Sequence, residues 1–148
     1  MPKVARVGKY SWIKVVDIMT EEPLRVRPSD AVGEADELMS ENKIRQLPVV
    51  QGNELVGIIT DRDIRSFLSG SELLTWEARE TARQTAVREI MTPEPLTISP
   101  DDDLRVVLEL LISEKIGGIP VVDEAAGLVG IVTYIDVLRC FLDRLQED

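Results

Sequence analysis

A threonine followed three residues later by an aspartate occurs twice at the end of an apolar run, as Thr60 with Asp63 and as Thr133 with Asp136. Threonine is a competent helix N-cap, and the free N–H groups of a first helical turn form a site for an anion such as phosphate. An aspartate one turn into the helix would repel phosphate but can accept hydrogen bonds from a vicinal diol, which a ribose supplies. Each pair could therefore distinguish the sugar of a nucleotide from its phosphate, although this spacing is also a common capping pattern.

Both pairs lie within a longer internal repeat. Residues 17–50 align on residues 89–122 at a constant offset of 72, with 15 identities in 34 positions. After one inserted residue the register resumes, and both copies end in Gly-x-x-Thr-x-x-Asp. A unit this short cannot bury enough apolar surface alone, so two copies related by a pseudo-twofold axis are expected to share one core.

The pattern in each copy predicts a strand, a helix, two strands joined by a turn, and a second helix. In the first copy the strands are expected at 24–27, 47–50 and 55–59, and the helices after Pro28-Ser29-Asp30 and near Asp61. In the second copy Ile98 closes the first strand, and strands 119–122 and 128–132 precede a helix that begins near Tyr134. The residues expected on the buried sides of the four helices are Val32, Ala35, Leu38 and Met39; Ile64, Phe67 and Leu68; Leu104, Val107, Leu108 and Leu111; Val137, Leu138, Phe141, Leu142 and Leu145.

Three consecutive aspartates, Asp101, Asp102 and Asp103, precede the first helix of the second copy. They could be imagined as a Mg²⁺ site, but successive residues at a helix start point in different directions. We expect them to cap the helix and to complement its dipole, so no metal site is predicted.

Composition limits the functions open to the chain. Its 148 residues carry a formal net charge of −10, which disfavours non-specific nucleic-acid binding. The absence of histidine removes Ser-His and Cys-His catalysis, and the single cysteine, Cys140, is expected to be a small core or interface hydrophobe. No apolar segment approaches the roughly 20 residues that span a bilayer, and no secretory signal is evident, so we expect a cytoplasmic protein without membrane contact.

We divide the chain into an N-terminal arm (1–16), a first repeat (17–68), a helical connector (69–88) and a second repeat (89–148). The arm is basic but carries interleaved apolar residues, so we favour an arm packed on the core or on a dimer mate over a free tail. In the connector, Trp76 is expected to cover the edge of the core; presenting it to a partner is the alternative.

Further motifs recur in both copies: Ile-Met-Thr at 18–20 and 90–92, and a Lys-Ile-x-x-hydrophobic-Pro-Val-Val run at 43–50 and 115–122. With the Gly-x-x-Thr-x-x-Asp motif, they closely resemble the cystathionine-β-synthase (CBS) domain, and the tandem resembles a Bateman module from Val16 to Phe141. The resemblance implies an α/β (α+β) fold of two pseudo-twofold-related βαββα units packed through their sheets. It also implies that two modules often associate into a flat disc, so a homodimer is expected.

The resemblance further implies adenosyl ligands, such as AMP, ADP, ATP or S-adenosylmethionine, in clefts between the two units. In the family's pattern the aspartate holds ribose, the threonine and the residue before the aspartate approach phosphate, and the opposite unit supplies an apolar adenine slot. Carried onto this sequence, the preferred cleft comprises Ile58, Thr60, Arg62, Asp63, Arg45 and Gln46, with Met91, Thr92, Leu96, Ile116 and Gly117 forming the adenine slot. Arg62 and Arg45 could both address an anion there.

The second cleft comprises Ile131, Thr133, Ile135 and Asp136, with Met19, Thr20, Leu24, Ile44 and Arg45 at the adenine. Its phosphate positions are Ile135, Gly117 and Gly118, none of which is a cation. A ligand there is expected to be uncharged at that end, or the cleft to be empty.

The leading hypothesis is therefore a regulatory module that binds an adenine nucleotide, alone or with Mg²⁺, needs no obligatory cofactor, and signals to a separate protein. The alternative is a constitutive dimerisation scaffold with vestigial clefts. A nucleotide hydrolase using Asp63 or Asp136 as base is disfavoured, because no nucleophile–base pair accompanies either residue. Neither the particular nucleotide nor the regulated partner follows from the sequence.

Overall fold

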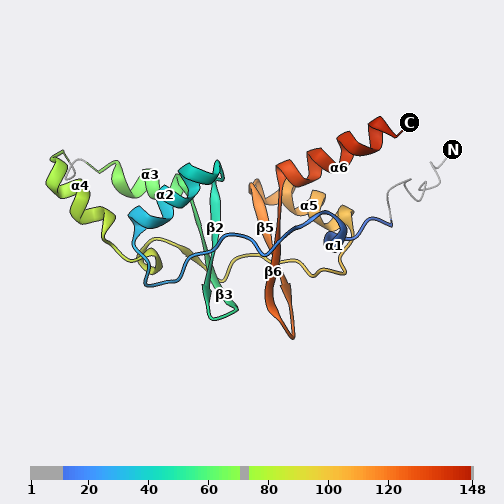
Figure 1. The fold of residues 1–148 in the computed structure, drawn as a ribbon, viewed down its shortest axis with the longest axis horizontal. Helices are drawn as coiled ribbons and strands as arrows, with labels where there is room; N and C mark the ends of the chain where they lie inside the picture. Colours follow the sequence, from blue (N-terminus) through green and yellow to red (C-terminus); the bar gives the residue numbers. More distant parts are fainter. Residues whose placement is uncertain (1–11, 71–73, 148) are drawn as a thin grey trace. The chain divides into compact units, whose positions relative to one another are not determined.

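The computed structural model describes residues 12–70 and 74–147 (Figure 1). The chain divides into two compact units at Glu22/Pro23 and at Pro95/Leu96. The continuous unit runs from Pro23 to Pro95, and the split unit combines the residues up to Glu22 with those from Leu96 onward. Each unit has its own apolar core.

The continuous unit holds the first strand–helix motif. Its sheet has the order β2-β3-β4, and all pairs are antiparallel. Its elements are α2 (Val32–Asn42), β2 (Gln46–Gln51), β3 (Glu54–Thr60), α3 (Asp61–Leu68), α4 (Trp76–Arg83), the 3-10 helix η2 (Val87–Glu89) and β4 (Thr92–Pro93).

The split unit repeats this plan around the second motif, with the sheet order β1-β6-β5. Its elements are α1 (Val15–Ile18), β1 (Thr20–Glu21), α5 (Leu104–Glu114), β5 (Gly118–Asp123), β6 (Gly127–Thr133) and α6 (Tyr134–Gln146). The Met-Thr segment that opens each sequence repeat thus pairs with the last strand of the other repeat.

Two antiparallel hairpins, β2–β3 and β5–β6, each supply two of the three strands of a sheet (Figure 1), with β3 and β6 as the central strands. Gly52 and Gly127 turn these hairpins with positive φ angles of 64° and 79°, which glycine adopts without steric cost. The strands expected at 47–50, 55–59, 119–122 and 128–132 are confirmed, each with slightly wider bounds. The α+β class is confirmed with them.

The expected strand at 24–27 is wrong. Only Val26 bridges to the sheet, in parallel to Val49, and Ile98 bridges to Val121 in the same way in the second copy. Val26 N donates to Pro48 O (3.1 Å) and Val50 N to Val26 O (2.9 Å), so the segment touches the sheet edge at one residue. Pro23 and Pro28 flank the segment and lack the N–H groups that a ladder needs.

The expected burial of α6 is only partly correct. Val137 is buried and Phe141 packs partly against the core, as predicted. Leu138, Leu142 and Leu145 are 63%, 54% and 69% exposed, so their placement on the buried side is wrong. These three leucines belong to neither core cluster of the described residues.

Trp76 does not cover the core edge, because it is 73% exposed and no residue of α4 is buried. The described part of the arm packs on the split unit, where Ile13 and Val15 are fully buried. Residues 1–11 of the expected arm lie outside the described residues. Cys140 is partly buried against the same core, as expected of a small hydrophobe.

Candidate strand–helix binding site

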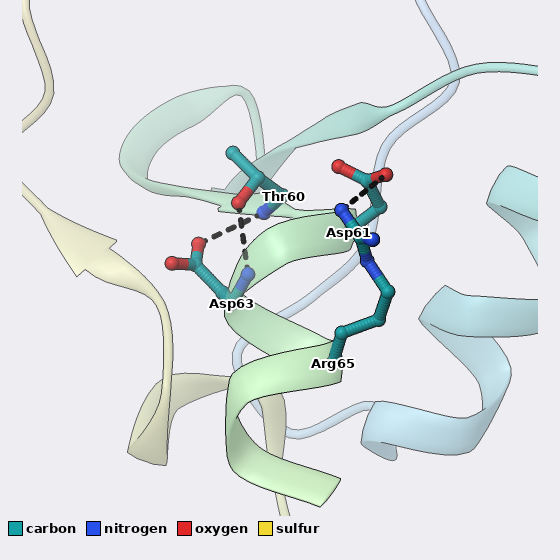
Figure 2. A network of polar contacts seen from close by, with 4 residues as sticks. All are labelled: Thr60, Asp61, Asp63 and Arg65. Carbon is teal, nitrogen blue, oxygen red and sulfur yellow. Dashed lines mark hydrogen bonds and ion pairs between the residues drawn. The ribbon is translucent and has the colours of Figure 1, made fainter. Parts of the chain in front are cut away.

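The first Thr-x-x-Asp motif lies where β3 runs directly into α3 (Figure 2). Thr60 is the N-cap, and its hydroxyl accepts a hydrogen bond from the backbone N–H of Asp63 (3.1 Å). The carboxylate Oδ2 of Asp63 in turn accepts from the N–H of Thr60 (2.9 Å). This reciprocal pair is a capping box, so the helix-capping interpretation of the motif is confirmed.

Capping also fixes the direction of the Asp63 carboxylate. One oxygen is held by Thr60, and the other accepts no hydrogen bond from the described residues (Figure 2). A group held by one oxygen with the other open is preorganised to accept further donors. The geometry is compatible with a diol at Asp63.

Two cations lie in the same unit. Arg62 and Arg45 are exposed, and neither forms an ion pair with any residue that the structure describes. Arg65 is different, because its guanidinium pairs with Asp61 at 3.4 Å (Figure 2). Arg45 belongs to this junction, since its carbonyl accepts from the N–H of Asp61 (2.9 Å).

The Met91-Thr92 segment joins this junction through β4. Thr92 lies opposite Ile58 of β3, and Pro93 lies opposite Gly57. A Cβ on Gly57 would come within 2.5 Å of the Met91 sulfur and 2.9 Å of the Thr92 carbonyl oxygen. Glycine therefore permits the close approach that brings the methionine onto the strand carrying the motif.

The second motif has the same construction but a more heavily engaged carboxylate. Oδ2 of Asp136 accepts from the N–H of Thr133 (2.8 Å) and from its hydroxyl (3.2 Å). Oδ1 accepts from the hydroxyl of Thr20 in β1 (3.0 Å). Asp136 is the one charged residue that is buried among those described, at 8% exposure.

Glycine again sets the approach of the crossing segment in the split unit. A Cβ on Gly130 would lie 2.6 Å from the Met19 sulfur. The expected phosphate positions carry no charge: Ile135 is exposed, Gly117 precedes β5, and Gly118 is the first residue of β5. Gly117 is connected to the junction through its carbonyl, which accepts from the N–H of Tyr134 (3.3 Å).

The structure thus brings together part of each predicted cleft within one unit. We call the first half-site the set Arg45, Gln46, Ile58, Thr60, Arg62, Asp63, Met91 and Thr92 in the continuous unit. We call the second half-site the set Met19, Thr20, Ile131, Thr133, Ile135 and Asp136 in the split unit. The remaining predicted residues belong to the other unit in each case and stay predictions: Leu96, Ile116 and Gly117 for the first cleft, and Leu24, Ile44 and Arg45 for the second.

Two features were missed by sequence reasoning. The hydroxyl of Thr20 was not expected on Asp136, and no role was assigned to Gly57 and Gly130. The signal for the glycines was present, because each copy combines a glycine in its last strand with a recurring Met-Thr pair. Nothing in the local sequence indicates that the Met-Thr pair would lie on that strand.

Two of the three aspartates before α5 accept hydrogen bonds from backbone N–H groups. Asp103 is the N-cap and accepts from the N–H of Val106 (3.2 Å), while Asp102 accepts from the N–H of Ser99 (2.8 Å). Within residues 12–70 and 74–147 no cluster of three or more potential metal ligands occurs. None of the helices described there is both long and apolar enough to cross a membrane.

Comparison with known proteins supports the repeat. A family model, that of the CBS domain, matches residues 15–70 and 87–143. The uncharacterized protein MJ1225 of Methanocaldococcus jannaschii is 33% identical over 146 residues, which cover 93% of this chain and 52% of the relative. The chain spans 52%, 21% and 43% of the length of the first three curated relatives that it matches.

Two solved structures are similar along most of their length. The crystal structure of CBSX2, a protein of Arabidopsis thaliana, in complex with AMP has a TM-score of 0.75 at 34% identity, covering 88% of this chain and 97% of that one. The crystal structure of the CBS domain pair of MJ0100 in complex with 5′-methylthioadenosine and S-adenosyl-L-methionine has a TM-score of 0.74 at 30% identity, with coverages of 88% and 97%.

Proposed function

The chain belongs to the CBS domain family and carries two copies of the domain, and on that basis we propose that it is a regulatory module that binds an adenine nucleotide. Solved relatives bind AMP in one case and 5′-methylthioadenosine and S-adenosyl-L-methionine in another, which supports an adenosyl ligand. AMP, ADP or ATP is favoured for this chain, because the first half-site offers two arginines to a phosphate.

The observation that carries the proposal is the Asp63 carboxylate, one oxygen of which accepts no hydrogen bond from the described residues, in the same unit as Arg45 and Arg62, which form no ion pair with those residues. Its free oxygen can accept the two hydroxyl groups of a ribose, and hydrogen bonds to a charged acceptor are the strong ones. Arg62 is adjacent in sequence to Asp63 and exposed. The first half-site therefore combines sugar and phosphate recognition at one helix terminus, and we rank it above the second.

The test is calorimetric titration of AMP into wild type, Asp63→Ala and Asp136→Ala. We expect Asp63→Ala to weaken AMP about tenfold to a hundredfold, the range for loss of hydrogen bonds to a charged group. Asp61→Ala is the matched control, because it removes a neighbouring carboxylate from the same helical turn. If Asp136→Ala abolishes AMP binding and Asp63→Ala does not, the ranking of the half-sites is wrong.

We further propose that the module acts without catalysis of its own. Thr60 and Asp63, like Thr133 and Asp136, are engaged in capping boxes, and no described group stands ready as a nucleophile with its base. Incubation of ATP and Mg²⁺ with the protein, followed by product analysis, should leave the nucleotide unchanged. A cytoplasmic location is part of the proposal, since the one cysteine in the sequence cannot form an internal disulfide.

One observation favours the second candidate, a constitutive dimerisation scaffold. Ile135, Leu138, Leu142 and Leu145 are 58%, 63%, 54% and 69% exposed. Their spacings of three, four and three residues place them on one face of α6, in the pattern of a helix–helix seam. We propose that a second copy of the chain covers this seam in a homodimer.

Sedimentation of wild type and Leu142→Lys tests the seam. We expect a dimer for wild type and a shift toward monomer for the variant, because a lysine ammonium would be desolvated in the interface. Ile112→Lys is the control, since Ile112 is 75% exposed on α5 and outside the seam. The response to AMP distinguishes the two candidate functions. A scaffold dimerises without any response to AMP, whereas a sensor changes its stability or association when AMP binds.

A further inference from the structure

The two aspartates of the half-sites differ in how many acceptor positions remain. An ionised carboxylate offers about four lone-pair positions. Asp63 uses one of them, for the N–H of Thr60. Asp136 uses three, for the N–H and hydroxyl of Thr133 and for the hydroxyl of Thr20. About three positions are therefore open at Asp63 and about one at Asp136.

Thr20 accounts for much of this difference. It lies opposite Ile131 in the split unit, as Thr92 lies opposite Ile58 in the continuous unit. Despite the same register, no hydrogen bond joins Thr92 to Asp63 among the residues that the structure describes. The chain therefore supplies its own hydroxyl group to one carboxylate of the pair and withholds it from the other.

A vicinal diol donates two hydrogen bonds. The open positions at Asp63 accommodate both, whereas Asp136 has room for only one while Thr20 remains bound. Resting on the function proposed above, we propose that Thr20 determines the affinity of the second half-site by occupying Asp136 in place of a ribose hydroxyl. A nucleoside that uses both of its ribose hydroxyls at Asp136 displaces the hydroxyl of Thr20.

The displaced residue belongs to β1, which has only two residues and pairs with β6 at Ile131 and Gly130. Glu22, where the chain leaves the split unit, follows at once and donates its N–H to the carbonyl of Val129 at a long 3.4 Å. Occupation of the second half-site therefore weakens the pairing of β1 with β6. β1 lies just before Glu22, where the chain leaves the split unit. Occupation of the first half-site breaks no corresponding contact.

The experiment isolates the second half-site by titrating adenosine into Asp63→Ala and into Asp63→Ala combined with Thr20→Val. Valine keeps the shape of threonine but removes the competing donor. We expect adenosine to bind about three- to tenfold more tightly to the double variant. Thr20→Ser restores a hydroxyl and should return the affinity to that of Asp63→Ala alone.

Two controls separate competition from a change of packing. Thr97→Val in the same Asp63→Ala background should leave adenosine binding within about twofold, since Thr97 is an exposed threonine of the split unit that belongs to neither half-site. 2′,3′-Dideoxyadenosine lacks the vicinal 2′,3′-diol that would compete with Thr20, so Thr20→Val should not tighten its binding. Unchanged or weaker adenosine binding in the Thr20→Val variant overturns the proposal.

A second measurement needs no substitution at Thr20. In Asp63→Ala, we expect the amides of residues 20–22 to exchange faster at saturating adenosine than without it. Unchanged or slower exchange would contradict displacement of Thr20. The outcomes also separate this inference from the proposed function. Failure of adenosine and AMP to bind wild type removes both, whereas binding to Asp63→Ala without any gain from Thr20→Val removes this inference alone.

Discussion

Asp63 and Asp136 each belong to a capping box and are each predicted to hold a sugar, so under the proposed function one carboxylate would serve both structure and recognition. The cap orients the carboxylate before any ligand arrives, which limits the entropy lost on binding. The difference between the two residues arises from neighbours far along the chain. It was therefore invisible in motifs that are identical in both copies.

At the first half-site, Arg62→Gln should weaken AMP about three- to tenfold while leaving adenosine unchanged, because glutamine keeps the polarity but not the charge that a phosphate requires. Titration of both ligands at low and high salt measures the effect, which should shrink as ions screen the exposed arginine. Arg65→Gln is the matched control, since Arg65 is already paired with Asp61. Equal losses for AMP and adenosine would rule out a phosphate contact.

Gly57→Ala should destabilise the protein by about 1–3 kcal/mol, the usual cost of overpacking. Its Cβ would meet both the Met91 sulfur and the Thr92 backbone, so a change of the methionine rotamer relieves only part of the clash. Chemical denaturation measures the loss. Gly70→Ala is the control, because a Cβ there would have nothing within 4 Å.

At the scale of elements, the helix ends were less predictable than the helices. Lys43 ends α2 and Lys115 ends α5, each in the left-handed region with φ of 54° and 53°. Glycine and asparagine are the usual residues there, so neither lysine signals a cap. The chain tolerates the strain because the N–H of Lys43 bonds to the last turn, and the N–H of Ile44 reaches back to the carbonyl of Met39 (3.0 Å).

Lys43→Gly should therefore stabilise the protein by about 0.5–1 kcal/mol, the left-handed penalty less the entropy that glycine adds to the unfolded chain. The expected rise in Tm is about 2 °C. Lys43→Ala keeps the Cβ and should give no such gain. An increase in Tm for alanine equal to that for glycine would show that the lysine charge, rather than its φ angle, is the cause.

Arg83 joins helix α4 to helix α2. The guanidinium of Arg83 bonds to Asp36 (2.7 Å) and to the carbonyl of Gly33 (3.2 Å). The hydrogen bond to Asp36 raises the pKa of Arg83 above its ordinary value despite partial burial. A raised pKa means that this contribution is fully present below the ordinary arginine pKa and is lost only as the pH rises beyond it.

Arg83→Met should consequently increase hydrogen exchange across 76–83 at any pH near neutrality, because methionine keeps the apolar stem without the bonds. Protection that is unchanged in Arg83→Met would mean that the backbone bonds around 84–87, such as Val32 N to Thr85 O (2.8 Å), hold α4 unaided.

Much of each unit could be predicted from the sequence, because β2, β3, β5 and β6 are short apolar runs bounded by turn residues. The exposure of the outer face of α6 could not be predicted. The spacing of leucines along a helix is the same whether the protein core or another molecule covers them. The contact between Thr20 and Asp136 lay beyond local pattern for a different reason. It joins positions 116 residues apart through a two-residue strand.

At the scale of the whole molecule, the boundaries of the sequence repeats differ from those of the compact units. The repeat at 17–68 lacks Val87, which is fully buried in the core of the continuous unit, and lacks β4. The range 23–95 contains that entire core. A fragment with the boundaries of the first repeat, 17–68, therefore has an incomplete core of the continuous unit. It also carries β1 without its partner strand β6.

We expect a fragment of residues 23–95 to melt cooperatively in circular dichroism and a fragment of residues 17–68 to be largely unfolded. Chains of this size are marginal even with a complete core, so loss of a fully buried valine and a strand should suffice. Cooperative folding of both fragments would show that β4 and Val87 are dispensable. As a control, residues 87–95 can be joined to the shorter fragment through a flexible linker, which should restore cooperative folding.

The division of the split unit also orders events at the ribosome. Every residue of the continuous unit has been synthesised once Pro95 emerges, whereas Ile13, Val15 and Thr20 must wait for partners in β5, β6 and α6. At typical elongation rates of about 5–20 residues per second, this delay lasts several seconds. The apolar segment around Ile13 and Val15 therefore stays without its core partners while the continuous unit is already complete, and during this interval it is open to chaperones and to neighbouring chains.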